Sequence, residues 1–170
     1  MFEQAAFRTA VRFGVLAALA SWAVLLGVYF AGFNPYGKSA FYALFILPVF
    51  LFLALAHYKK YADPELKFWK GLRVSWLTTL VAALTFSMLV YLFSVVAGQE
   101  AIRVHIQEMK AMMAQSKAQF LKLPNGQQAY DLNYNALDQI TPGSLVVDNF
   151  LKMLLIGFLF SFVSATFSRK

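Results

Sequence analysis

Hydrophobic residues along the chain fall into long blocks separated by shorter polar stretches. The first block, 13–33, carries no charged residue. At ~1.5 Å per residue, a helix of this length reaches roughly 31 Å, which is about the thickness of the hydrocarbon core of a bilayer. Comparable blocks occupy 40–57, 72–97 and 145–167. The pattern predicts an all-α, integral membrane four-helix bundle, with residues 1–170 forming a single membrane domain.

Turn and breaker residues divide the blocks. The sequence NPYG at 34–37 is typical of a β-turn, so the first two spans form an antiparallel pair. Pro48 predicts a kink inside the second span because it lacks a backbone N–H. The sequence DPE at 63–65 predicts that the third helix begins near Pro64. Pro142 and Gly143 break the chain before the fourth span, and Ser144 is the expected cap.

A long polar segment, 99–143, separates the third and fourth spans. Within it, 99–123 contains neither proline nor glycine, and 124–126 (PNG) is a turn sequence. Apolar residues before the turn recur at helical spacing, and after it Tyr130 and Tyr134 continue the spacing. This predicts an amphipathic helical hairpin outside the membrane, with the third span able to run straight into its first helix. The stripe of the first helix contains Ile102, Ile106, Met109, Met113 and Phe120.

Three interpretations of this segment remain open at the level of sequence. The hairpin can bury its two apolar stripes against each other. The longer stripe can instead lie flat on the membrane surface as an interfacial helix. Its methionine-rich face can also bind a partner, as flexible methionine surfaces do. On the third interpretation, the stripe residues are the candidate partner contact.

The distribution of positive charge predicts the orientation. Four spans place both ends of the chain on one side, and nine of the 15 lysines and arginines lie on that side. The positive-inside rule therefore predicts cytoplasmic termini and a periplasmic segment 99–143, in a multi-pass protein of the bacterial inner membrane. The cytoplasmic set is Arg8, Arg12, Lys59, Lys60, Lys67, Lys70, Arg73, Arg169 and Lys170, against Lys38, Arg103, Lys110, Lys117 and Lys122 outside.

Membrane lipids are the first partners that the sequence predicts. The connector 57–73 is rich in basic and aromatic residues, which is typical of a segment at the level of the lipid headgroups. The candidate headgroup contacts are Lys59, Lys60, Lys67, Trp69, Lys70 and Arg73. Small residues at every fourth position predict close helix packing within the bundle or between copies. They are Ala23, Gly27 and Ala31; Ser75, Thr79, Ala83 and Ser87; and Gly157, Ser161 and Ala165.

Composition excludes several classes of function. Hydrophobic residues make up 60% of the chain, which is above the level of ordinary soluble domains. There is no cysteine, so disulfides, thiolate metal sites and cysteine nucleophiles are excluded. The net charge of +7 is explained by residues flanking the spans, and we expect no nucleic-acid binding.

Candidate chemistry is sparse. The predicted topology places His57 and His105 on opposite sides of the membrane, so they cannot share a metal, and no phosphate-binding or hydrolase motif is present. We expect no catalytic residues, no metal and no cofactor. The one intramembrane charge pair is Asp148 and Lys152, which can meet because they are four residues apart on one helix. The pair either lies at the interface, lines an ion or proton path, or contacts a partner.

The chain resembles one known family. The resemblance rests on NPYG at 34–37 after the first span and on FWKG at 68–71 opening the third. The long segment between the third and fourth spans and the basic end Arg169-Lys170 also fit. On these features the chain is similar to the four-span inner-membrane proteins of Bacteroidota grouped as domain of unknown function 4199. The resemblance implies a location and a number of spans, but no activity and no site residues.

Two functions remain from the sequence. The first is a non-enzymatic accessory, assembly or scaffolding subunit that acts through the periplasmic segment, either as a homo-oligomer or with another membrane protein. The alternative is a subunit of a small-solute or ion transporter or channel, in which Asp148 and Lys152 contribute to the path. An enzyme acting on lipids is the weakest class, because only the basic connector offers a polar cluster.

Overall fold

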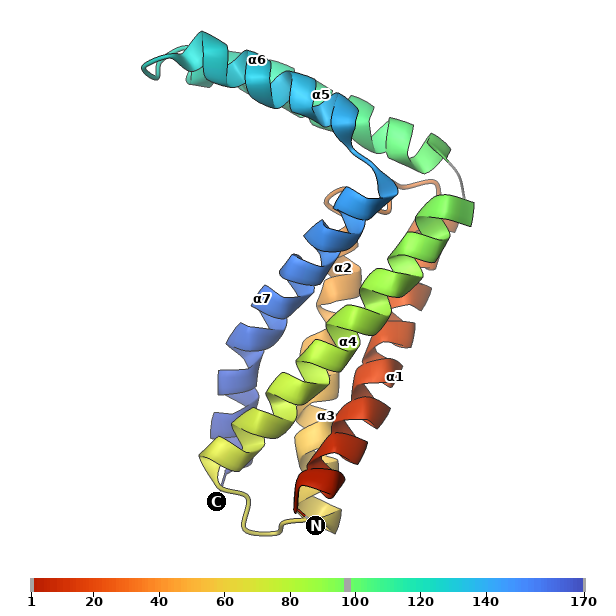
Figure 1. Ribbon diagram of the computed structural model, residues 1–170, viewed down its shortest axis with the longest axis vertical. Helices are drawn as coiled ribbons and strands as arrows, with labels where there is room; N and C mark the ends of the chain where they lie inside the picture. The colour runs from red at the N-terminus through yellow and green to blue at the C-terminus, as the bar shows by residue number, and fades with distance from the viewer. Residues whose placement is uncertain (1, 97–98, 170) are drawn as a thin grey trace.

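A computed structural model describes residues 2–96 and 99–169, and every regular element in these ranges is helical. Four antiparallel rods form a bundle: α1 (Phe2–Phe30), α2 with α3 (Ala40–Leu44 and Ile46–Tyr61), α4 (Phe68–Val96) and α7 (Pro142–Ser168). Between α4 and α7 lie α5 (Gln99–Phe120), α6 (Gly126–Ala136) and the short helix η1 (Leu137–Gln139). We call 99–139 the arm. It lies crosswise over one end of the bundle, and both termini lie at the other end (Figure 1).

Small side chains let α4 and α7 pack closely at the centre of the bundle. A Cβ atom added to Gly157 would lie 2.2 Å from Cγ2 of Thr79, so no larger residue fits there without movement. At the next level the hydroxyls of Ser75 and Ser164 are 3.2 Å apart. These contacts agree with the close packing that the spacing of small residues predicts for these two helices.

The stripe Ala23–Gly27–Ala31 of the first span is different. Ala23 and Ala31 are exposed, and a Cβ atom added to Gly27 meets nothing within 4 Å. Instead α1 approaches α4 at Gly14, whose added Cβ would lie 2.8 Å from Cβ of Val81. The prediction that this stripe packs inside the bundle is wrong, because α1 turns the Gly14 side of its surface toward α4.

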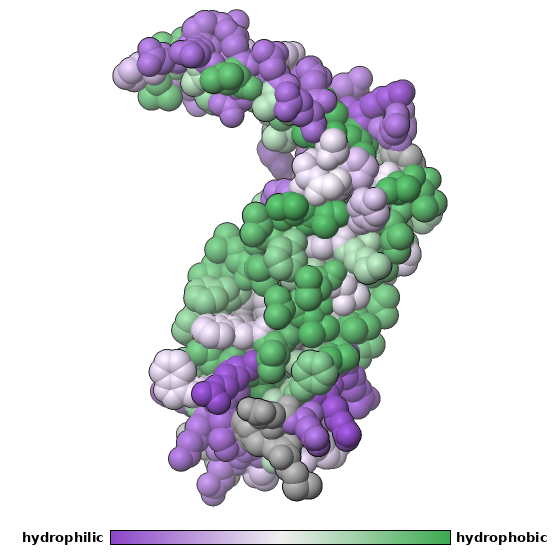
Figure 2. All heavy atoms as spheres, in the orientation of Figure 1, coloured by the Kyte–Doolittle hydropathy of each residue, from purple (hydrophilic) through white to green (hydrophobic). Residues whose placement is uncertain are grey.

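The outside of the bundle is apolar where a soluble protein would be polar. Large hydrophobic side chains such as Leu84, Leu151 and Leu155 are more than half exposed. The space-filling view shows this apolar belt between a polar lower end and a polar arm (Figure 2). Within the described residues, four helical segments are long and apolar enough to cross a membrane: Gln4–Phe30, Ala40–Tyr61, Phe68–Val96 and Pro142–Ser168. The chain is therefore a multi-pass membrane protein.

Three helix boundaries differ from the prediction. The second span is interrupted at Phe45, between α2 and α3 rather than at Pro48, because the proline ring clashes with the carbonyl of Leu44 four residues earlier. The helix α4 begins at Phe68 and not at Pro64, since Leu66 is buried at 1% exposure and ties the connector to the bundle. The fourth helix begins at Pro142.

The cap of α7 is also different from the predicted Ser144. Thr141 is the N-cap, and its side chain accepts a hydrogen bond from the backbone N–H of Ser144. The Ser144 hydroxyl lies 2.9 Å from the backbone N of Thr141 and completes a capping box. Pro142 fits at the first helical position because its missing N–H would have no partner there.

In the arm, α5 and α6 lie against each other. The rings of Phe120 and Tyr130 are 5.9 Å apart, and the Lys117 ammonium lies 5.1 Å from the centre of the Tyr130 ring. Lys110 pairs with Asp138 of η1 at 2.6 Å. The predicted straight continuation of the third span falls on 97–98, which lie outside the described residues. On either side of them, α4 and α5 run in different directions (Figure 1).

Candidate functional site

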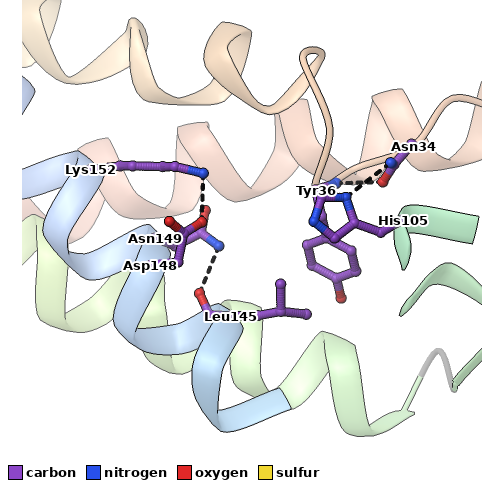
Figure 3. A network of polar contacts seen from close by, with 7 residues as sticks. All are labelled: Asn34, Tyr36, His105, Leu145, Asp148, Asn149 and Lys152. Atoms are coloured by element: carbon purple, nitrogen blue, oxygen red, sulfur yellow. Dashed lines mark hydrogen bonds and ion pairs between the residues drawn. The ribbon is translucent and has the colours of Figure 1, made fainter. Parts of the chain in front are cut away.

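The NPYG turn between α1 and α2 forms the joint between the bundle and the arm (Figure 3). Asn34 is 7% exposed, and its side-chain oxygen accepts a hydrogen bond from the Tyr36 backbone N–H at 2.9 Å. Its amide nitrogen donates to Oε2 of Glu108 on α5 at 2.7 Å and lies 3.2 Å from Nδ1 of His105. We call Asn34, Tyr36, His105 and Glu108 the joint.

The hydrogen bonds of Asn34 fix the tautomer of His105. The oxygen of the amide faces a backbone N–H, so the amide nitrogen must face His105 and Glu108. This nitrogen carries two hydrogens, one for each neighbour. Nδ1 of His105 therefore accepts, and in the neutral ring the proton lies on Nε2. The joint requires an uncharged His105.

Tyr36 connects the same turn to α4. Its hydroxyl lies 2.7 Å from the hydroxyl of Ser94, which itself donates to the carbonyl of Val90 at 2.7 Å. Since Ser94 has one hydrogen, Tyr36 is the donor of the pair. Burial raises the pKa of Tyr36 above 10.0 and keeps this hydroxyl protonated. The Tyr36 ring also meets the ring of His105 edge-on, at 5.9 Å between centroids.

Apolar packing at the start of α5 reinforces the joint. Ala101 and Ile102 are 6% and 7% exposed and belong to the main core of the bundle, and Ile106 packs against it. His105 is 9% exposed. Burial lowers the pKa of His105 below 6.5, and the nearby Lys152 ammonium lowers it further, while Glu108 and Asp148 act in the opposite direction.

Asp148 and Lys152 form the predicted pair on α7, with 2.5 Å between Nζ and Oδ2. Their side chains are 49% and 39% exposed. Both border a cavity of about 380 Å³ beneath the arm, together with His105 and Lys38. We call it the sub-arm cavity. It lies beside the joint, where the arm, the α1–α2 turn and α7 come together (Figure 3).

The predicted partner-contact residues have different surroundings. Ile102 and Ile106 contact the bundle core, and Phe120 contacts Tyr130 of α6. Met109 borders the sub-arm cavity, and Met113 is half-buried. Large apolar side chains that the arm does expose lie elsewhere, at Val104, Leu121, Leu123 and Leu132.

The predicted headgroup residues gather at the opposite end of the bundle. Lys70 pairs with Asp63 at 2.8 Å, and Lys59 donates to the carbonyl of Ser168 at 2.9 Å. The Trp69 side chain is 70% exposed. His57 lies in the same region, with its ring 5.2 Å from that of Phe13, so the two histidines are at different ends of the bundle. The remaining members, Lys60, Lys67 and Arg73, are partly or fully exposed.

Sequence reasoning missed the joint. It treated 34–37 only as a turn, although Asn34 and His105 are 71 residues apart in the chain and in contact. Periodicity carries no signal for such a pair. Within 2–96 and 99–169, no group of three or more His, Asp or Glu side chains is placed to hold a metal. The arrangement at the joint can hold two parts of the molecule together and can exchange a proton at His105.

Comparison with known proteins places the chain in a described family. The model of a family described as "Protein of unknown function (DUF4199)" matches residues 12–170, which is nearly the whole chain. No curated protein and no solved structure matches this chain. The match confirms the family resemblance of the sequence and assigns no activity.

Proposed function

This chain belongs to the DUF4199 family of proteins of unknown function, and we propose that it is a non-enzymatic accessory, assembly or scaffolding subunit of a membrane complex. The observation that supports this function is the arm, which extends crosswise beyond the bundle (Figure 1) and is anchored by Asn34 and Ile102. An anchored arm presents a fixed surface to a neighbouring membrane protein, so little conformational entropy is lost when the two associate.

The part of the arm farthest from the joint is the proposed contact. Leu121 and Leu123, in the turn between α5 and α6, are 50% and 60% exposed, and Leu132 on α6 is 66% exposed. The residues around them are largely polar. Exposed leucines on an otherwise polar surface favour association. The half-buried methionines Met109 and Met113 are a second contact if the partner inserts beneath the arm.

The native mass of the full-length chain, extracted gently from its own membranes, tests the proposal. We expect a defined complex that contains either a second copy or one other membrane protein in fixed ratio. The double variant Leu121→Ser and Leu123→Ser releases the partner, whereas Leu84→Ser, on the membrane-facing side of α4, does not. A lone monomer in native membranes, or a complex that is indifferent to the arm variants, overturns the proposal.

The proposed location is the bacterial inner membrane, with cytoplasmic termini and a periplasmic arm. The excess of basic residues at the end of the bundle opposite the arm supports this orientation. Because the chain has no cysteine, single cysteines can be introduced. In intact cells, Gln119→Cys should react with a membrane-impermeant maleimide and Ala62→Cys should not; both positions are exposed. If Ala62→Cys reacts and Gln119→Cys does not, the arm is cytoplasmic and the proposed orientation is wrong.

A subunit of a small-solute or ion transporter or channel is the second candidate. The feature that favours it is the pair Asp148–Lys152 in a membrane helix, since ionisable groups there are costly and commonly functional. In liposomes, Asp148→Asn with Lys152→Gln would abolish a measured flux without changing the native mass. An arm variant that leaves the flux intact but dissociates the complex favours the first function.

A further inference from the structure

The sub-arm cavity combines polar groups of both signs with apolar walls. Lys38 and Lys152 border it as cations and Asp148 as an anion. Phe41, Met109 and Leu145 supply apolar surface. A cavity with this lining fits a ligand that carries a positive and a negative group close together and an apolar remainder.

His105 adds a directed donor. Because Nδ1 accepts from Asn34, the ring proton lies on Nε2, on the side of the ring that faces α7 (Figure 3). Among the described residues, no group accepts a hydrogen bond from this Nε2–H. His105 is 91% buried, being 9% exposed, and it borders the cavity. An oxygen of a ligand in the cavity can accept the hydrogen bond of this N–H.

The position of the cavity favours a lipid as its ligand. Its lining includes residues of α2, α5 and the first turns of α7. The apolar belt ends below the arm (Figure 2). Phe41 of α2 borders the cavity and is 48% exposed, and Phe45, which follows α2, is 55% exposed. Acyl chains can lie along these aromatic side chains while a headgroup occupies the cavity.

We propose that the sub-arm cavity binds the headgroup of a phospholipid that carries a phosphate and a primary ammonium, as phosphatidylethanolamine does. The phosphate oxygens accept hydrogen bonds from Lys152, Lys38 and Nε2 of His105. The ammonium donates to the carboxylate of Asp148, which exchanges part of its bond to Lys152 for the ligand. Each charge of the headgroup then has an opposite charge in the cavity. A headgroup bound there touches the arm and the bundle together.

Binding of lipids with identical dioleoyl chains tests the proposal. The full-length protein in mild detergent is titrated with phosphatidylethanolamine, phosphatidylcholine or phosphatidylglycerol, and lipid-bound species are counted by native mass spectrometry. Phosphatidylcholine has no ammonium N–H, and phosphatidylglycerol has no cation. We expect phosphatidylethanolamine to bind about tenfold more tightly than either, the effect of one charge-assisted hydrogen bond.

Variants assign the preference to the cavity. Asp148→Asn should bring the ratio of phosphatidylethanolamine to phosphatidylglycerol close to one or below it, and Lys152→Gln should weaken binding of every phospholipid. Lys38→Gln, in an exposed loop position, repeats the second test if Lys152→Gln does not fold. Asp131→Asn and Lys122→Gln, on exposed parts of the arm, are the matched controls and should change nothing.

Other outcomes overturn the proposal. If the wild-type protein binds phosphatidylethanolamine and phosphatidylcholine equally, the cavity does not recognise the ammonium N–H groups. Preferential binding of phosphatidylglycerol identifies a site for anionic headgroups instead. Lipid binding that is the same in the wild type and all three cavity variants shows that the lipid lies elsewhere. The number of protein chains is read from the same spectra, so the result is separate from the proposed association.

Discussion

The bundle packs through small, fully buried side chains, whereas the arm packs through rings, long side chains and an ion pair that stay partly exposed. Ala82 and Ser161 have no exposed surface, while Lys110 and Asp138 have side chains that are 25% and 60% exposed. In a membrane the first arrangement gains dispersion contacts and avoids unpaired polar groups. In water the second gains only modest energy from each contact. Because the contacts inside the arm are weak, we expect the hydrogen bonds and packing of the joint to hold the arm in its position over the bundle.

Gly157→Ala should give the largest loss of stability, because the new Cβ would overlap the side chain of Thr79 at 2.2 Å. Overpacking of this kind costs about 1–3 kcal/mol. Unfolding of the purified protein in mixed micelles, followed by circular dichroism, measures the change. Gly27→Ala is the matched control, since nothing lies within 4 Å of its added Cβ, and it should be neutral or slightly stabilising. Equal losses for both variants would mean that α4 and α7 do not meet at Gly157.

Asn34→Ala should release the arm and leave the bundle folded. It removes the donor to Glu108 and His105 and the acceptor for the Tyr36 N–H, for a loss of about 1–2 kcal/mol at the joint. Hydrogen exchange of 99–109 measures the release. The control is Asn133→Ala, whose exposed side chain bonds only to the carbonyl of Ala129. If exchange increases equally throughout α4 and α7, Asn34 stabilises the bundle rather than the arm.

The contrast also separates what the sequence could predict from what it could not. The spans follow from the length and composition of the apolar blocks, and the turn at 34–37 follows from its Asn, Pro and Gly residues. The helical structure in 99–139 follows from the spacing of its apolar residues and from the positions of its proline and glycine. The break at Phe45 and the start of α4 at Phe68 depend on contacts such as that of Leu66, which local rules do not contain. The placement of the arm depends on Asn34 meeting His105, and no single-sequence pattern reports a contact across 71 residues.

The pH dependence of the joint should follow His105. Burial is the main reason why the pKa of His105 in the folded protein lies below 6.5. As pH falls below 6.5, His105 therefore binds a proton more readily in the released arm than in the docked arm. Docking is then fully stable above pH 6.5 and weakens as pH falls through the lowered pKa. Protonation also places an N–H on Nδ1 against the amide hydrogens of Asn34. Lys152 faces the same ring and opposes its charge, while Glu108 and Asp148 favour it.

Exchange of 99–109 at pH 7.5 and pH 5, corrected for intrinsic rates, measures this effect. Protection should decrease at the lower pH in the wild type. His105→Gln keeps a neutral polar side chain at the joint and should make protection independent of pH. The same decrease in the variant would assign the pH dependence to Glu108 or to the pair on α7.

Asp138→Asn should have the smallest effect, and it tests whether the arm is held by its joint or by its own contacts. The pair Lys110–Asp138 is short, at 2.6 Å, but it is open to water, where such a pair contributes about 0.2–1 kcal/mol and is screened by salt. Lys110 also lies 4.9 Å from the centre of the Tyr134 ring, a contact that the variant retains. The rate of amide hydrogen exchange in 126–136 should therefore increase at most about fivefold. The rate in 99–109 should not change. If Asp138→Asn released 99–109 as fully as Asn34→Ala, the ion pair and not the joint would hold the arm over the bundle.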